Sequence, residues 1–233
     1  MKFLVGLLFL PFCAAATRTV WHLAPSVAVT SQVSPASVWG LAAGFSLWVV
    51  LFLCLPRPVT AYVFAHELTH AVWGWAMGAR ISRFRVGARG GSVNLSKSNF
   101  LITLAPYFFP LYTILVVAAH GLLALFYDMR AYEPLWLGFV GLTWSFHLTF
   151  TITTLRQHQP DIRIHGRLFS YALIYLFNLL GIGLGIVAVA PPTLGEFAGH
   201  LGSDILQIWE SGCRLAHIVW AFLMEHLPSR AAV

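Results

Sequence analysis

Residues 59–78 read VTAYVFAHELTHAVWGWAMG, an apolar stretch that is interrupted by His66, Glu67 and His70. A helix needs about 20 mainly apolar residues to cross the hydrocarbon core of a bilayer, and this stretch has that length and character. Ionisable side chains are costly inside a membrane and usually mark a functional site. The stretch therefore predicts a membrane helix that carries chemistry.

The rest of the chain has the same membrane-like composition. Its 233 residues are 58% hydrophobic and only 9% charged, whereas a soluble domain has about 25% charged residues. This composition argues against a soluble domain and against a disordered protein. The formal charge of +6 is assigned to loops that flank membrane helices, because the basic residues lie between long apolar runs. No nucleic-acid partner is expected.

Four further apolar runs predict membrane helices. They occupy residues 38–55, 100–127, 134–155 and 168–190. Pro106 and Pro110 are expected to kink the second of these runs. The pattern predicts an all-α multi-pass membrane protein with about five or six transmembrane helices, embedded in the lipid bilayer, and gives no indication of its oligomeric state.

The two ends of the chain have weaker patterns. Residues 3–16 are apolar but short for a span, so a signal peptide and a first membrane helix are both open, and residues 17–37 are interpreted as a loop. Residues 195–227 predict an amphipathic helix that is either interfacial or a final span. Three regions are therefore expected: an N-terminal segment and loop (1–37), a membrane-embedded core (38–190) and a C-terminal helix (191–233).

The loop at residues 79–99 alternates between polar and apolar residues on both sides of a glycine-rich turn, GARGG at 87–91. The pattern predicts a short β-hairpin after the helix, and the alternative is a plain basic loop. This loop and the loop at 156–167 are both rich in arginine and lie two spans apart. Because cytoplasmic loops carry an excess of positive charge, we expect both on the cytoplasmic side.

His66, Glu67 and His70 form the motif HExxH. Residues four apart share one face of a helix, so both imidazoles can bind one ion. Glu67 lies about 100° further around the helix, where its carboxylate can hold a metal-bound water and take its proton. Zinc is the expected cofactor, since imidazole and carboxylate ligands around an open position are typical of catalytic zinc. The alternative is a buried polar cluster that only pairs helices.

A catalytic zinc ion needs a third protein ligand. Asp161 is the only carboxylate between residues 134 and 195, and it lies on the same side of the membrane as the loop that follows the HExxH helix. We expect Asp161 to complete the site. The alternative is a solvated acid that pairs with Arg163 or Arg156.

An HExxH motif in a membrane helix, a basic loop with glycines, further spans and a later aspartate together resemble the site-2 protease family of intramembrane zinc metalloproteases. The similarity covers roughly residues 40–190, and the chain resembles a minimal member without a PDZ domain. The resemblance implies that the two histidines bind zinc, that Asp161 is the third ligand and that Glu67 is the catalytic residue. The chain departs from the family's Asp-Gly motif, because Ile162 follows the aspartate.

The function implied is a zinc-dependent endopeptidase that hydrolyses peptide bonds of membrane-embedded or membrane-proximal substrates. A transmembrane helix hides its peptide bonds in its own hydrogen bonds, so a substrate must be locally extended, and the edge of the hairpin can bind it by strand addition. Asn94 and Asn99 are candidate substrate-binding residues, and each is equally an ordinary turn or helix-cap residue. Two other classes stay open: a membrane zinc hydrolase acting on a lipid amide or ester, and a non-catalytic scaffold.

Overall fold

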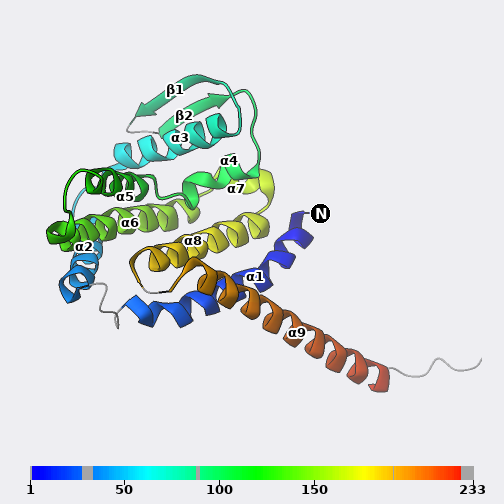
Figure 1. The fold of residues 1–233 in the computed structure, drawn as a ribbon. Helices are drawn as coiled ribbons and strands as arrows, with labels where there is room; N and C mark the ends of the chain where they lie inside the picture. Colours follow the sequence, from blue (N-terminus) through cyan, green and yellow to red (C-terminus); the bar gives the residue numbers. More distant parts are fainter. Residues whose placement is uncertain (1, 28–33, 88–89, 191, 227–233) are drawn as a thin grey trace, which may run out of the picture.

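The computed structural model describes residues 2–27, 34–87, 90–190 and 192–226 (Figure 1). Most of this chain is helical, with one small sheet, as the sequence predicts. In chain order the elements are α1 (Lys2–Leu23), η1 (Ala24–Val27), α2 (Pro35–Cys54), α3 (Val59–Ala76), β1 (Ile81–Gly87), β2 (Gly90–Leu95), α4 (Phe100–Leu104), η2 (Ala105–Tyr107), α5 (Leu111–Ala124), η3 (Arg130–Tyr132), α6 (Glu133–Leu155), α7 (Pro160–His165), α8 (Arg167–Val189) and α9 (Leu194–His226).

Several helices are long and apolar enough to cross a bilayer, which fits a multi-pass membrane protein. Within the described residues there are four such segments, and a fifth if one bent pair of helices counts as a single span. The four are Lys2–Val27, Pro35–Cys54, Arg130–Leu155 and Arg167–Val189. Helix α3 is not among them, so the prediction that it is a membrane helix is not supported by its length and hydropathy. Its His, Glu and Thr side chains lower its mean hydropathy.

The predicted kink in the run at 100–127 is confirmed, and the structure shows a complete break between two helices. Helices Phe100–Tyr107 and Leu111–Ala124 meet at an angle of 80° across a short break. Pro110 stands directly before the second helix and has no N–H to continue a helical ladder. The break turns the end of the first helix into the protein core, where Tyr107 is fully buried.

The predicted loop at 17–37 is wrong over residues 17–27, which continue α1 to Leu23 and then form η1, and over residues 35–37, which begin α2. The polar side chains that interrupt the apolar run here have partners on another helix. Arg18 Nε lies 3.0 Å from Asp204 of α9, and the Thr19 hydroxyl donates to the same carboxylate over 2.7 Å. Residues 28–33 lie outside the described residues. Residues 3–16 belong to the same helix, which packs along α8.

Helices α2 and α6 pack closely through glycines. Gly40 and Gly44 are four residues apart on α2, a spacing that lets helix backbones approach. A Cβ atom at Gly44 would overlap the carbonyl of Gly138, and one at Gly141 would overlap the carbonyl of Leu41. An aromatic cluster of Trp48, Phe52, Phe146 and Phe150 continues the interface, and Tyr62 near the start of α3 packs against it.

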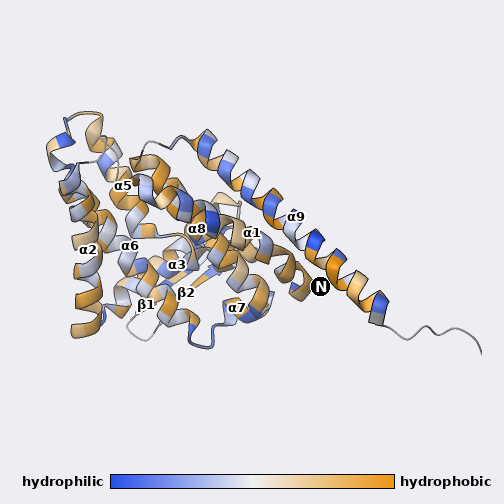
Figure 2. Cartoon of the chain, turned by 90° about the horizontal axis from the view of Figure 1, so that it is seen from below, coloured by the Kyte–Doolittle hydropathy of each residue, from blue (hydrophilic) through white to orange (hydrophobic). Residues whose placement is uncertain are grey.

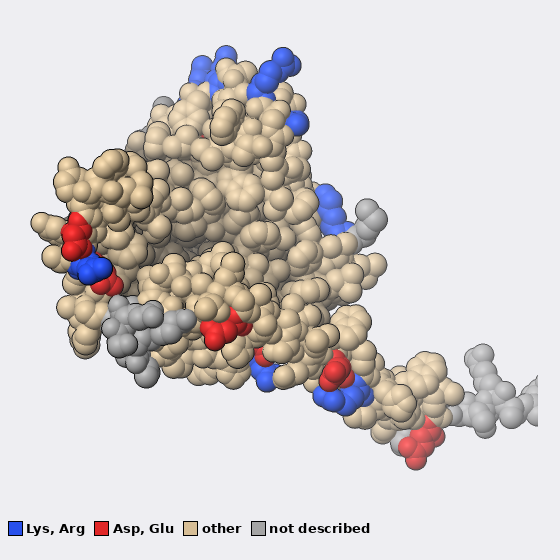
Figure 3. All heavy atoms as spheres, in the orientation of Figure 1, with Lys and Arg blue, Asp and Glu red and all other residues tan. Residues whose placement is uncertain are grey.

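The predicted hairpin is confirmed. Strands β1 and β2 pair antiparallel from Gly87 opposite Gly90 to Ile81 opposite Leu95, and the turn at 88–89 lies outside the described residues. Both strands pack on α3 (Figure 1). Lys and Arg side chains gather over the hairpin at the top of Figure 3, whereas the visible Asp and Glu lie toward the opposite side.

Helix α9 is amphipathic, as predicted, with hydrophilic and hydrophobic residues alternating along it in Figure 2. Its first half packs on α1 through Asp204, and its second half extends away from the bundle (Figure 1). It does not qualify as a membrane span among the described helices.

Candidate metal centre

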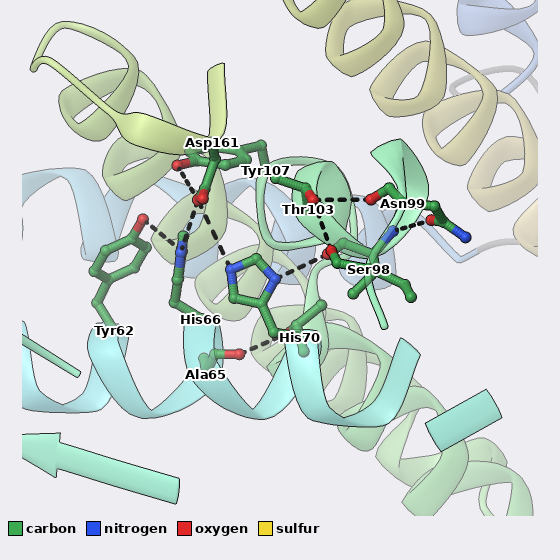
Figure 4. A network of polar contacts seen from close by, with 11 residues as sticks. Tyr62, Ala65, His66, His70, Ser98, Asn99, Thr103, Tyr107 and Asp161 are labelled. Atoms are coloured by element: carbon green, nitrogen blue, oxygen red, sulfur yellow. Dashed lines mark hydrogen bonds and ion pairs between the residues drawn. The ribbon is translucent and has the colours of Figure 1, made fainter. Parts of the chain in front are cut away.

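The two histidines of the HExxH motif lie on one face of α3, as the helical spacing predicts. Their ring centroids are 4.9 Å apart, and both rings rise from the helix toward the segment that carries Asp161 (Figure 4). The helix begins after Pro58 and ends before Gly78, which has a φ of 75°, a conformation that favours glycine. The motif therefore sits in the middle of a regular helix that fixes its geometry.

Asp161 reaches the histidines from α7, a short helix that begins at Pro160. Proline suits the first position of a helix, where no backbone N–H is needed. The next residue, Ile162, is 3% exposed and packs into the same core as Leu104 and Leu173. Because Ile162 anchors α7 on one side, the neighbouring carboxylate is turned toward α3.

The three side chains meet closely. Asp161 Oδ2 lies 3.6 Å from His66 Nε2 and 3.8 Å from His70 Nε2, and one ligand atom from each of the three lies within 4.8 Å of the others. Tetrahedral metal–ligand bonds of about 2.1 Å separate ligand atoms by about 3.4 Å. The separations are thus longer than good hydrogen bonds and close to those around a shared ion.

The groups that contact Nδ1 of His66 and His70 also fit a metal centre. His70 Nδ1 lies 2.8 Å from the carbonyl oxygen of Ile102. A carbonyl can only accept, so this nitrogen carries a proton, and a neutral ring then directs the lone pair of Nε2 at Asp161. In that form Nε2 and the carboxylate of Asp161 are both free to bind one cation. His66 Nδ1 is similarly held, 3.2 Å from the hydroxyl of Tyr62, in the manner of outer partners that orient metal-binding histidines.

Asp161 is held as an ionised carboxylate. Burial alone would raise its pKa, but the rings of His66 and His70 beside it hold the pKa well below the usual range. The hydroxyl of Tyr107 donates to Oδ2 over 3.0 Å. A negative charge is thus available to the site, and among the described residues no ion pair joins Asp161 to Arg163 or Arg156.

Glu67 lies beside this centre and faces the hairpin. It is 9% exposed, its carboxylate faces the backbone of Val93 on β2, and its Cγ would lie 2.6 Å from a Cβ atom placed on Gly91. Glu67 and His66 open into a cleft of about 470 Å³, which we call the Glu67 cleft. Besides α3, the cleft is lined by the start of β2 and by the end of α6 with the segment after it, notably Gly90, Gly91, Thr153, Thr154, Gln157 and Gln159.

The two candidate substrate-binding asparagines do not line the Glu67 cleft. Asn94 is exposed on β2, opposite Arg83. Asn99 is the N-cap of α4: its side chain accepts from the N–H of Ile102 over 2.9 Å. The helix-cap interpretation of Asn99 is thus correct. Asn99 contacts the site only indirectly: it binds the N–H of Ile102, and the carbonyl of Ile102 contacts His70.

Sequence reasoning missed two tyrosines. Tyr62 lies one helical turn before His66, and the spacing of four residues that links the histidines could have identified it. Tyr107 comes from a distant apolar run, and nothing in its local sequence marks it.

No family model, curated protein or solved structure matches the chain. The arrangement of the metal centre is therefore interpreted from its own geometry.

Proposed function

We propose that the protein is a zinc-dependent intramembrane endopeptidase, similar to the site-2 proteases, that cleaves membrane-embedded or membrane-proximal peptide substrates. One observation carries the proposal: His66, His70 and Asp161 converge on one point, and Glu67 lines a cleft beside it. Two imidazoles and one carboxylate are a common set of protein ligands for catalytic zinc.

The residues would divide the work as follows. Bound zinc would polarise the scissile carbonyl and make a water molecule easier to deprotonate. Glu67 accepts a proton from that water as the water oxygen attacks the carbonyl carbon. It then donates the proton to the amine nitrogen as the C–N bond breaks. Tyr62 and the carbonyl of Ile102 keep the two imidazoles in the required orientation.

The shape of the Glu67 cleft favours an extended peptide over a lipid. Backbone of β2 at Gly90 and Gly91 forms one wall, and a strand edge offers main-chain hydrogen bonds to an unwound segment. Polar side chains of Thr153, Gln157 and Gln159 form the opposite side. A substrate helix that unwinds here finds new partners for its backbone groups, which it needs in a membrane.

The cleft is assigned to the cytoplasmic side of the membrane. We take the hairpin loop and the loop at 156–167 to lie on the same side, because the bent pair of helices and α6 separate them and each of these is taken to cross the membrane once. Both carry an excess of arginine, which is typical of cytoplasmic loops.

The test compares Glu67→Gln with the wild type and with Glu133→Gln, a control in the first turn of α6 that does not line the Glu67 cleft. Each protein, reconstituted in nanodiscs, is given a fluorogenic transmembrane peptide and, in parallel, a lipid amide. We expect peptide cleavage by the wild type and by Glu133→Gln, and a loss of about 100-fold or more in Glu67→Gln with zinc still bound. Hydrolysis of the lipid alone, or full activity of Glu67→Gln, would refute the proposal.

A further inference from the structure

A second cleft, which is strongly basic, lies next to Ile162, the residue that follows Asp161. It has a volume of about 210 Å³, and we call it the arginine cleft. The charged and titratable side chains that line it are Arg156, His158, Arg163, Arg167 and Tyr171. No carboxylate lines it among the described residues, so its positive charge is not neutralised locally.

The guanidinium groups of this cleft have no partners in the described part of the chain. Arg156, Arg163 and Arg167 make no ion pair or side-chain hydrogen bond there, whereas Arg18 and Arg130 each pair with an aspartate. The nearest acid along the chain, Asp161, is committed to the two histidines and to Tyr107. Three unpaired arginines around one hollow favour an anion.

The position of the cleft favours one kind of anion. Arg156 directly follows the last residue of α6, and Arg167 is the first residue of α8. Both helices are long and apolar enough to cross a bilayer, so the cleft lies at the level at which lipid headgroups begin. Basic pockets between membrane helices at this level suit phosphate headgroups, and the planar guanidinium binds phosphate oxygens in pairs.

We propose that the arginine cleft binds the phosphate of an anionic phospholipid headgroup. The apolar floor at Leu155 and Ile162 suits the glycerol and upper acyl part of such a lipid. Gln157 and Gln159 line both this cleft and the Glu67 cleft. A bound headgroup therefore stabilises the position of the segment that precedes Asp161. This effect on the metal site rests on the proposed function, whereas the binding of the lipid does not depend on it.

The test measures lipid binding and needs no enzyme activity. The full chain is reconstituted in nanodiscs of mixed phosphatidylglycerol and phosphatidylcholine, and retained lipids are counted by native mass spectrometry. We expect the wild type to retain phosphatidylglycerol selectively. The triple variant Arg156→Gln, Arg163→Gln, Arg167→Gln should lose this preference, by about fivefold for each arginine. The matched triple variant Arg80→Gln, Arg83→Gln, Arg85→Gln on the hairpin should keep it.

Two further arms separate the possible explanations. Arg→Lys at the same three cleft positions keeps the charge and should restore much of the selectivity, which excludes a merely misfolded triple variant. Inorganic phosphate is titrated against protein in pure phosphatidylcholine nanodiscs. Equal loss in both glutamine triples would show general surface electrostatics and overturn the proposal. So would stabilisation by inorganic phosphate without selective retention of phosphatidylglycerol, which would assign the cleft to a soluble phosphate.

Discussion

The hydroxyl of Tyr107 donates a hydrogen bond to Oδ2 of Asp161 over 3.0 Å. Tyr107 ends the first helix of the bent pair, and it reaches Asp161 because the chain turns by 80° after it. The bend near Pro110 thus lies directly after a residue that contacts the candidate metal centre.

Removal of this hydroxyl should weaken metal binding. Tyr107→Phe keeps the ring that fills the core but leaves Asp161 without its donor, so the carboxylate is less firmly oriented. Loss of such an outer partner typically lowers metal affinity by about 10- to 100-fold. Competition with a chromophoric zinc chelator measures the affinity.

The matched control is Tyr112→Phe. That hydroxyl donates to the carbonyl of Ala61 over 2.8 Å, so its loss removes a comparable hydrogen bond away from Asp161. An equal drop in zinc affinity in both variants would contradict a specific role for Tyr107.

Asn99 should affect the metal centre through the helix it caps. Asn99→Ala removes the acceptor for the N–H of Ile102 and loosens the carbonyl that holds His70. We expect a loss of about 0.5–2 kcal/mol in the free energy of unfolding, together with lower zinc affinity. Ser34→Ala, which removes the cap of α2, should cost similar stability and leave zinc affinity unchanged. Equal zinc affinity in wild type and Asn99→Ala would reject this link.

Gly91 should be needed for the contact between the hairpin and Glu67. In Gly91→Ala the new Cβ would lie 2.6 Å from Glu67 Cγ and 2.7 Å from Val63 Cγ1, so β2 or the carboxylate must move. Overpacking of this kind costs about 1–3 kcal/mol, and peptidase activity should fall while zinc stays bound. Gly121→Ala on α5, where a Cβ meets nothing within 4 Å, should leave activity intact. Full activity of Gly91→Ala would show that this close packing is not required.

The α2–α6 interface should depend on its glycines. Gly44→Val places a branched side chain against the carbonyl of Gly138 and must push the helices apart. We expect a lower thermal unfolding midpoint in nanodiscs. Gly121→Val, in open space on α5, is the control for helix propensity. An unfolding midpoint equal to that of the control would argue against close helix packing here.

Features with a local cause could be predicted from the sequence. The pairing of His66 with His70 follows from helical spacing, the hairpin follows from alternation around glycines, and the break follows from two prolines. Asp161 could be found by elimination, because that part of the chain has no other carboxylate. In each case the residues near the feature contain the information.

Features that depend on tertiary partners could not be predicted. Residues 17–23 contain polar side chains that suggest a loop, and they are helical because Asp204 on α9 bonds to Arg18 and Thr19. Tyr107 is one aromatic residue in an apolar run until the fold brings Asp161 to it. The role of Asn99 similarly depends on where the carbonyl of Ile102 points.

The central claim is that His66, His70 and Asp161 hold one divalent ion, and the zinc content of the purified full chain tests it most directly. Plasma mass spectrometry should find one zinc ion per chain in the wild type, in Glu67→Gln and in Asp128→Asn, which alters an exposed acid. It should find almost none in His70→Ala or Asp161→Ala. A wild-type protein without metal, or an Asp161→Ala protein with its full zinc content, would contradict the account.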